Sequence, residues 1–269
     1  MTLQKIPGFE STAYAYQGGR VVWAGLQPAT DHPRSAWAPW KPPVLAQALD
    51  TTRLQAGAAT CLALFSPAIG QQPADALLIR HIPYAAVAKG LLLWLTGQAL
   101  PFPLNHAASR FDSVRHTLLQ HDLPAFAEAA KRLLGLGHGL TPSGDDFVGG
   151  IMFTLSHLRH ASPAQAWLGG LPQVARELNQ AAASSTNVIS AALLEDLLAG
   201  SSYRVLHALL AALDSQDDAS IQLATADLLA LGASSGADLL AGVLVALTTL
   251  NSPTSSTSPP FFHPQPTRH

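Results

Sequence analysis

Two apolar segments of this chain share a polar start and carry glycines in their interiors. TPSGDDFVGGIMFTL (141–155) and ASSGADLLAGVLVAL (233–247), aligned without gaps, both read serine-glycine-x-aspartate, then glycine four residues later. Their apolar spacing predicts helices. A glycine inside a helix costs roughly 1 kcal/mol against alanine, so Gly149, Gly150 and Gly242 need a compensating gain. Tight packing of one helix backbone on another supplies it, which indicates two core helices that cross at their glycines.

The residues ahead of the first segment are typical of a helix start. A threonine-proline step at Thr141 fits an N-cap followed by a first-turn proline, whereas Ser143 with Asp146 fits a variant of the capping box. Either reading starts the helix near 142–144, with unpaired N–H groups at its end. Adjacent helical residues point about 100° apart. One of Asp145 and Asp146 can therefore serve the helix while the other faces a ligand or metal.

The loop GLGHGL (135–140) lies just before this helix start and supplies backbone N–H groups that can cradle an anion. Carboxylates in the first turn repel a phosphate there. Two solutions are possible. A Mg²⁺ ion could bridge the carboxylates and the phosphate, or the ligand could carry N–H donors of its own, as an amide or ureido group does. The sequence leaves both open.

We predict that the two helix starts form one polar site around a common hollow. The predicted catalytic residues, which are also the candidate ligands of any Mg²⁺, are Asp145, Asp146 and Asp238. The predicted ligand-binding residues come from the two starts and from a hydroxyl-rich stretch between them: Gly137, His138, Gly139, Thr141, Ser143, Gly144, Thr186, Asn187, Ser235 and Gly236. A cap on the next helix is an equally good role for Asn187.

The apolar pattern changes near residue 100. Before it, short runs bounded by Gly, Pro and Gln predict strands; these are 20–25, 59–66 and 75–82. Residues 85–97 fit a helix weakened by Gly90, and the proline-rich 31–43 fit a loop.

After residue 100 the spacing is helical, with Asp122 as a cap and Gly135 as a stop for the first helix. The predicted helices cover 122–135, 173–183, 187–200, 202–213, 220–232 and 236–250. The sequence thus predicts an α+β fold. A β-rich domain (1–100) precedes a helical domain (101–250) that carries both motifs, and a Ser/Pro-rich flexible tail (251–269) follows.

Composition narrows the function classes. Net charge is −2 with 12% charged residues, which gives no field to attract nucleic acid or an anionic membrane. The longest apolar runs are too short to span a bilayer, and the N-terminus lacks the apolar core of a signal peptide. Cys61 is the single cysteine, which fits a free thiol in a reducing compartment. These features predict a cytoplasmic protein, and its apolar composition suits an oligomer.

GLGHGLTPSGDDFVGG (135–150) resembles the signature of the AllH-like family, one subunit of bacterial oxamate carbamoyltransferase in allantoin breakdown. LGASSGADLLAG (231–242) resembles a later family stretch, SSTNVISAALLEDLLAG (184–200) a hydroxyl-rich helix start, and LFSPAIGQQPADALLI (64–79) a strand-rich N-terminal segment. Two positions depart from the family pattern. His138 stands in place of a proline, and Ala233 in place of a histidine, so no acid/base role carries over to position 233.

The resemblance implies carbamoyl transfer between carbamoyl phosphate and oxamate, or oxalurate phosphorolysis in reverse, with other carbamoyltransferase subunits as partners. Ser143–Gly144 and Ser235–Gly236 would then supply N–H donors to the phosphate or the carbonyl, while Asp146 or Asp238 orients the amide. Arginines are expected on the anions; the candidates are Arg110, Arg115, Arg159 and Arg204.

Two alternatives to this function stay open. One is a Mg²⁺-dependent hydrolase or phosphotransfer enzyme that uses the three aspartates of the two motifs. The other is a non-catalytic assembly subunit whose motif helices pack against a partner.

Overall fold

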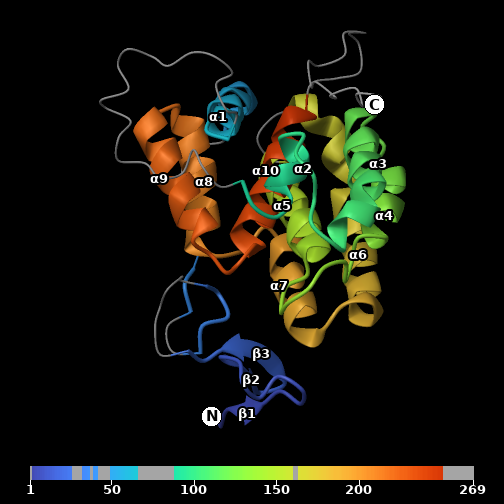
Figure 1. Ribbon diagram of the computed structural model, residues 1–269, viewed down its shortest axis with the longest axis vertical. Helices are drawn as coiled ribbons and strands as arrows, with labels where there is room; N and C mark the ends of the chain where they lie inside the picture. Colours follow the sequence, from blue (N-terminus) through green and yellow to red (C-terminus); the bar gives the residue numbers. More distant parts are fainter. Residues whose placement is uncertain are drawn as a thin grey trace, which may run out of the picture.

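The chain combines a small N-terminal sheet with a larger helical body (Figure 1). The computed structural model describes residues 2–25, 32–36, 39–41, 49–65, 88–159 and 163–250. The predicted fold class is confirmed. The strand predicted at 75–82 and the tail 251–269 lie outside the described residues, as does part of the loop predicted at 31–43. The division into three domain ranges stays a prediction.

The sheet contains three antiparallel strands in chain order: β1 (Gln4–Lys5), β2 (Tyr14–Gln17) and β3 (Arg20–Trp23). Strands β2 and β3 are joined by Gly18 and Gly19, both with positive φ, as a two-residue hairpin turn requires. The strand predicted at 20–25 is confirmed by β3. The sheet is attached to the helical body by a separate apolar cluster, formed by Ile6, Val21, Ile189 and Leu193.

The helical body follows the predicted pattern closely after residue 120. Its elements are α1 (Thr51–Ala63), α2 (Leu92–Leu95), η2 (Leu104–Ala107), α3 (Ala108–Leu119), α4 (Leu123–Lys131), α5 (Ser143–Leu158), η3 (Pro163–Gly170), α6 (Leu171–Ser185), α7 (Val188–Leu198), α8 (Arg204–Ser215), α9 (Asp218–Leu229) and α10 (Ser235–Thr248). The predicted caps are confirmed, because the Asp122 and Asn187 side chains accept from the N–H groups that open α4 and α7.

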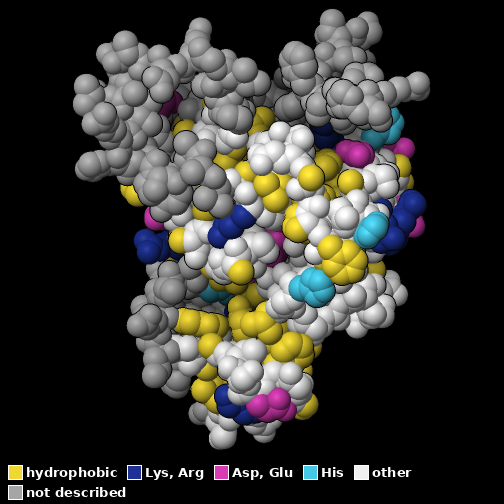
Figure 2. Space-filling model, in the orientation of Figure 1, with side chains coloured by type: hydrophobic (Ala, Val, Ile, Leu, Met, Phe, Trp, Pro, Cys, Tyr) yellow, Lys and Arg dark blue, Asp and Glu magenta, His cyan; other side chains and the backbone are white. Residues whose placement is uncertain are grey.

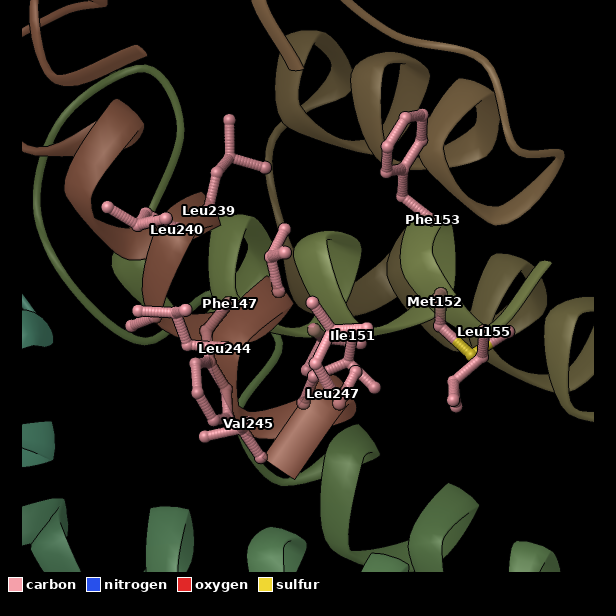
Figure 3. Close-up of a cluster of buried hydrophobic side chains, with 14 of the residues drawn as sticks. Phe147, Ile151, Met152, Phe153, Leu155, Leu239, Leu240, Leu244, Val245 and Leu247 are labelled. Carbon is pink, nitrogen blue, oxygen red and sulfur yellow. The ribbon is translucent and has the colours of Figure 1, made fainter. Parts of the chain in front are cut away.

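Helices α5 and α10 cross at the centre of the body, with α1, α8 and α9 on one side and α3, α4 and α6 on the other (Figure 1). A Cβ on Gly150 would collide with the Leu239 carbonyl oxygen, and one on Gly242 with that of Phe147. Large side chains such as Phe147 and Leu244 fill the space around this crossing (Figure 3). The predicted glycine crossing is therefore confirmed.

The segments that lead into α5 and α10 are built alike. The Gly144 N–H donates to the Leu136 carbonyl, and the Gly236 N–H to that of Leu231, both at 2.9 Å. Each helix therefore begins folded tightly onto the turn before it. The two helix starts therefore share a backbone hydrogen-bond pattern as well as a sequence pattern, and we call them equivalent in this sense.

The strand predicted at 59–66 is wrong, because these residues lie largely within helix α1. Leu54, Ala58 and Cys61 are spaced to bury one helix face, and the Asp50 side chain caps the first turn. Residues 85–87 of the helix predicted at 85–97 lie outside the described residues. In the described remainder only the single turn of α2 is α-helical, because Gly90 has a positive φ. None of the described helices is long and apolar enough to cross a membrane.

Candidate functional site

Asp145, in the first turn of α5, is tied into the protein by three donors. It accepts the Gly135 N–H at 2.7 Å, the Ser190 hydroxyl at 2.6 Å and the Thr186 hydroxyl. These bonds lower its pKa, but burial raises the pKa more, and the net direction is upward. Asp145 thus fastens the glycine loop to the α6–α7 turn. One of the two adjacent carboxylates therefore has a clear structural task.

We expect Asp145→Asn to lower the free energy of unfolding by about 1–3 kcal/mol, because an amide NH₂ would face donors that need an acceptor. Urea denaturation followed by circular dichroism measures this loss. The exposed Asp227→Asn on α9 is the matched control and should leave stability unchanged. Equal stability of both variants would contradict the tethering role of Asp145.

Asp146 and Asp238 lie in the first turns of α5 and α10, and both are buried. Burial, with the neighbouring Asp238 second, raises the pKa of Asp146 well above its ordinary value, while hydrogen bonding to Thr141 and Ser235 lowers it. Burial likewise raises the pKa of Asp238 to about 6. The Oδ2 atom of each carboxyl has no hydrogen-bond partner among the described residues. Unpartnered buried oxygens of this kind are costly, which is typical of a functional site.

The two helix starts touch directly. The Thr141 hydroxyl, just before α5, lies 2.7 Å from the Ser235 hydroxyl, the first residue of α10. The predicted meeting of the two starts is thereby confirmed. Neither helix has a side-chain cap: Pro142 and Ser234 hold the N-cap positions without one. The predictions of a Thr141 cap and of a Ser143 capping box are therefore wrong, because Thr141 bonds across to α10 instead.

A pocket of about 290 Å³ opens over this contact. It is lined by residues from both starts and from two tyrosine-bearing segments: Tyr14, His138, Gly139, Leu140, Thr141, Tyr203, Leu231, Gly232, Ala233, Ser234 and Ser235. The Tyr14 and Tyr203 hydroxyls are 3.4 Å apart, and burial raises the pKa of both. The Asp146 charge makes a smaller contribution in the same direction to the pKa of both tyrosines.

The predicted site residues fall into three groups. Four of them line the pocket: His138, Gly139, Thr141 and Ser235. Three lie behind it as buried groups at the helix junction: Ser143, Asp146 and Asp238. The others surround Asp145 or shape the backbone: Gly137, Gly144, Thr186, Asn187 and Gly236. Ligand binding by each of these residues stays a prediction, as does catalysis by the three aspartates.

Sequence reasoning missed Tyr14, Tyr203 and Ser234 as lining residues. It also expected arginines, but within the described ranges no arginine or lysine lines the pocket. Asp145, Asp146 and Asp238 were candidate metal ligands. Within the described ranges, no group of three or more His, Cys, Asp or Glu side chains is arranged to hold a metal ion.

A second hollow of about 740 Å³ lies between the sheet and helices α6 and α7. Its lining includes Arg34, which donates to Asp196 at 2.5 Å and to Glu195 at 2.8 Å, both of them also lining residues. Both partners hold this guanidinium in the wall. On the face shown in Figure 2, apolar side chains continue across the junction between the sheet and the helices.

Fold and pocket define an α+β protein whose polar site is built from two equivalent helix starts, over a pair of buried carboxyl groups. The family model described as oxamate carbamoyltransferase subunit AllH matches residues 133–247, which include both starts. The resemblance to the AllH family is therefore confirmed over this segment. No curated protein and no solved structure matched the chain.

Proposed function

We propose that this chain is a subunit of a cytoplasmic oxamate carbamoyltransferase-type enzyme. It would transfer a carbamoyl group between carbamoyl phosphate and oxamate, in complex with other carbamoyltransferase subunits. The observation that carries the proposal is that the two family motifs meet in one pocket, with Thr141 and Ser235 in contact at 2.7 Å. The nearby Asp146 and Asp238 supply buried carboxyls: burial raises the pKa of Asp238 to about 6, which suits proton exchange near neutral pH, and raises that of Asp146 well above its ordinary value.

The reaction forms a bond between the oxamate nitrogen and the carbamoyl carbon and breaks the bond from that carbon to the phosphate oxygen. The phosphate leaves with the bonding electron pair, and the nitrogen loses one proton. In our proposal Asp146 takes up that proton through the Thr141 and Ser235 hydroxyls. These hydroxyls also bind the carbamoyl carbonyl while negative charge develops on its oxygen.

The anionic groups of both substrates need cations, and none of the pocket-lining residues in the described part of the chain is an arginine or a lysine. We therefore assign the phosphate-binding cations to a partner subunit, because a dianion beside buried carboxyls is unfavourable without them. With this assignment, we expect turnover by the complex and none by this chain alone.

The test is turnover of the complex, purified with its partner subunits and supplied with carbamoyl phosphate and oxamate. Asp146→Asn should lower kcat at least about 100-fold, as loss of an acid/base group does. Ser113→Ala on the exposed face of α3 is the control and should leave turnover unchanged. Phosphate release gives the rate.

Two outcomes would replace this function with an alternative. A strict Mg²⁺ requirement with hydrolysis of phosphate esters would indicate the hydrolase or phosphotransfer reading, with Asp145, Asp146 and Asp238 as metal ligands. Full turnover in Asp146→Asn would indicate a non-catalytic assembly subunit.

A further inference from the structure

One wall of the 290 Å³ pocket comes from the N-terminal sheet. Tyr14 lies on β2 and lines the pocket beside Tyr203, which comes just before α8, and their hydroxyls are 3.4 Å apart. We call these two residues the tyrosine wall. The other lining residues belong to the helical body. The tyrosine wall therefore depends on the position that the sheet takes on that body.

The apolar contact between the sheet and the helical body is small. Its buried residues are Ile6 and Val21 on the side of the sheet and Ile189 and Leu193 on α7. Figure 1 shows the sheet at one end of the helical body, and the 740 Å³ hollow lies between the sheet and helices α6 and α7. A sheet of a few short strands depends on packing against a helix for its stability. A polar contact that fixes its position therefore has a direct effect on the pocket.

Arg34 supplies such a contact. Its Nε donates to Asp196 at 2.5 Å and its Nη2 to Glu195 at 2.8 Å, both on α7, while its Nη1 donates to the Val21 carbonyl on β3 at 3.3 Å. The Arg34 side chain is 5% exposed and that of Asp196 14%, so salt in the solvent screens this ion pair little. Hydrogen bonds between charged groups are also stronger than those between neutral groups. One guanidinium thus binds β3 and α7 at the same time.

The segment around Arg34 reaches both tyrosines of the wall. The Trp23 N–H donates to the Arg34 carbonyl at 2.9 Å, and Trp23 pairs with Tyr14 in the β2–β3 ladder. In the other direction, the Arg34 N–H donates to His32 Nδ1 at 3.0 Å, and the His32 ring lies 4.5 Å from the Tyr203 ring. Arg34 is therefore linked through a single residue to each half of the tyrosine wall.

A buried ion pair can fix an arrangement without adding much to stability. Much of the attraction between the two charges is offset by the water that each charge loses on folding. The guanidinium fork sets both the direction and the distance of its partners, which a single ammonium group does not. The contacts of Arg34 are therefore better suited to position the sheet than to raise the stability of the whole fold.

We infer that Arg34 is a positioning residue for the pocket: by fastening β3 to α7, it holds Tyr14 against Tyr203 and so forms the tyrosine wall. Arg34 is not among the residues that line this pocket, so it acts through the two tyrosines. The inference holds whichever ligand the pocket binds. It rests on the proposed function only where turnover is measured.

The test is ¹⁹F NMR of the full chain labelled with fluorotyrosine, with Tyr→Phe variants to assign the signals. When Arg34 is present, Tyr14→Phe should shift the Tyr203 signal, because the two hydroxyls are neighbours. In Arg34→Met, Tyr14→Phe should no longer shift that signal. Arg53→Met is the matched control, since Arg53 pairs with Asp214 at the other end of α8, and it should leave the Tyr14-dependent shift intact.

A second variant keeps the test decisive if Arg34→Met does not fold. Glu195→Gln combined with Asp196→Asn keeps the shapes of both partners and removes their charges, and it should likewise abolish the dependence of the Tyr203 signal on Tyr14. Circular dichroism of each variant checks that the helical body is retained. A Tyr14-dependent shift that persists in these folded variants would overturn the inference, because Arg34 would then contribute to stability alone.

The same variants separate this inference from the proposed function. In the complex, Arg34→Met should raise the KM for carbamoyl phosphate at least about tenfold with kcat unchanged, as loss of a binding surface does. Tyr14→Ala added to it should raise the KM no further, because both changes remove the same wall. Loss of the coupling between Tyr14 and Tyr203 in Arg34→Met, with a complex that does not turn over, supports the inference and removes the proposed function. Turnover with an unchanged KM in Arg34→Met, together with intact coupling, does the reverse.

Discussion

Gly242→Ala is expected to lower the free energy of unfolding by about 3 kcal/mol, although alanine is the better helix former. The added Cβ would meet the Phe147 carbonyl oxygen and lie close to the Gly150 Cα on the facing helix. The obstacle is backbone on both sides, so no side chain can rotate away. Helices α5 and α10 would have to separate along the core they share.

The control for this variant is Gly169→Ala in η3, where an added Cβ meets nothing within 4 Å. Its stability should stay within about 0.5 kcal/mol of the unchanged protein. Urea denaturation of both variants, followed by circular dichroism, gives the two free energies. If Gly242→Ala proved as stable as Gly169→Ala, the close crossing at the centre of the fold would be wrong.

The crossing of α5 and α10 was predictable because glycine inside a helix lowers stability, and the positions of such glycines can be read from the sequence. Gly150 and Gly242 interrupt otherwise strong apolar helices, and only a close neighbour compensates for that. The caps at Asp122 and Asn187 were predictable for a similar reason, since the capping bond joins residues two or three apart.

Taken by itself, the apolar run at 59–66 predicts a strand, although most of it belongs to helix α1. The helical spacing becomes visible only from Asp50 onward, where Leu54 and Ala58 join Cys61 on one buried face. A short apolar run cannot distinguish a strand from part of a buried helix. Packing against α8 and α10 then selects the helix.

The pocket was only half predictable. Part of its lining comes from the two motif starts, and their shared serine-glycine-x-aspartate pattern predicts that they act together. Its tyrosine wall joins Tyr14 to Tyr203 across 189 residues, and no local pattern links a strand residue to the residue before a distant helix. The arginines expected from the substrate's charge are not among the lining residues that the structure describes, and the charge of a substrate does not tell which residues of a fold would bind it.

Mild acid is expected to destabilise the protein through two buried histidines. The His32 ring lies 4.5 Å from the Tyr203 ring at a tilted angle, and the His207 ring lies 5.0 Å from Trp40 and 4.8 Å from Phe153. Burial lowers the pKa of His32 to about 3 and that of His207 to about 4. In the unfolded chain both bind protons near pH 6.5, so the folded state holds fewer protons between these values. Stability is therefore full above about pH 6.5 and is lost as the pH falls towards 4.

Charged and titratable groups around His32 and His207 change how much stability is lost in acid, but the contribution of these two histidines stays destabilising. Arg34 and His207 further lower the pKa of His32, and His157, with its ring 5.4 Å away, further lowers that of His207. Asp196 lies 3.9 Å from His32. Asp238, with a pKa of about 6, acts in the opposite sense and gains stability as the pH falls. Burial also raises the pKa values of Asp145, Asp146 and Asp196, which act in the same sense as Asp238. The histidine contribution is therefore measured by comparing variants and not from the whole-protein curve.

His207→Phe isolates that contribution, because phenylalanine keeps a ring against Trp40 and Phe153 but binds no proton. Between pH 7 and pH 4.5 this variant should lose about 2–3 kcal/mol less stability than the unchanged protein, the equivalent of about two pH units for one group. Urea denaturation at five pH values across this range measures the difference. His116→Phe, at the end of α3 and outside this cluster, is the control and should follow the unchanged protein at every pH. Parallel curves for His207→Phe and the unchanged protein would show that His207 is not held neutral by its surroundings.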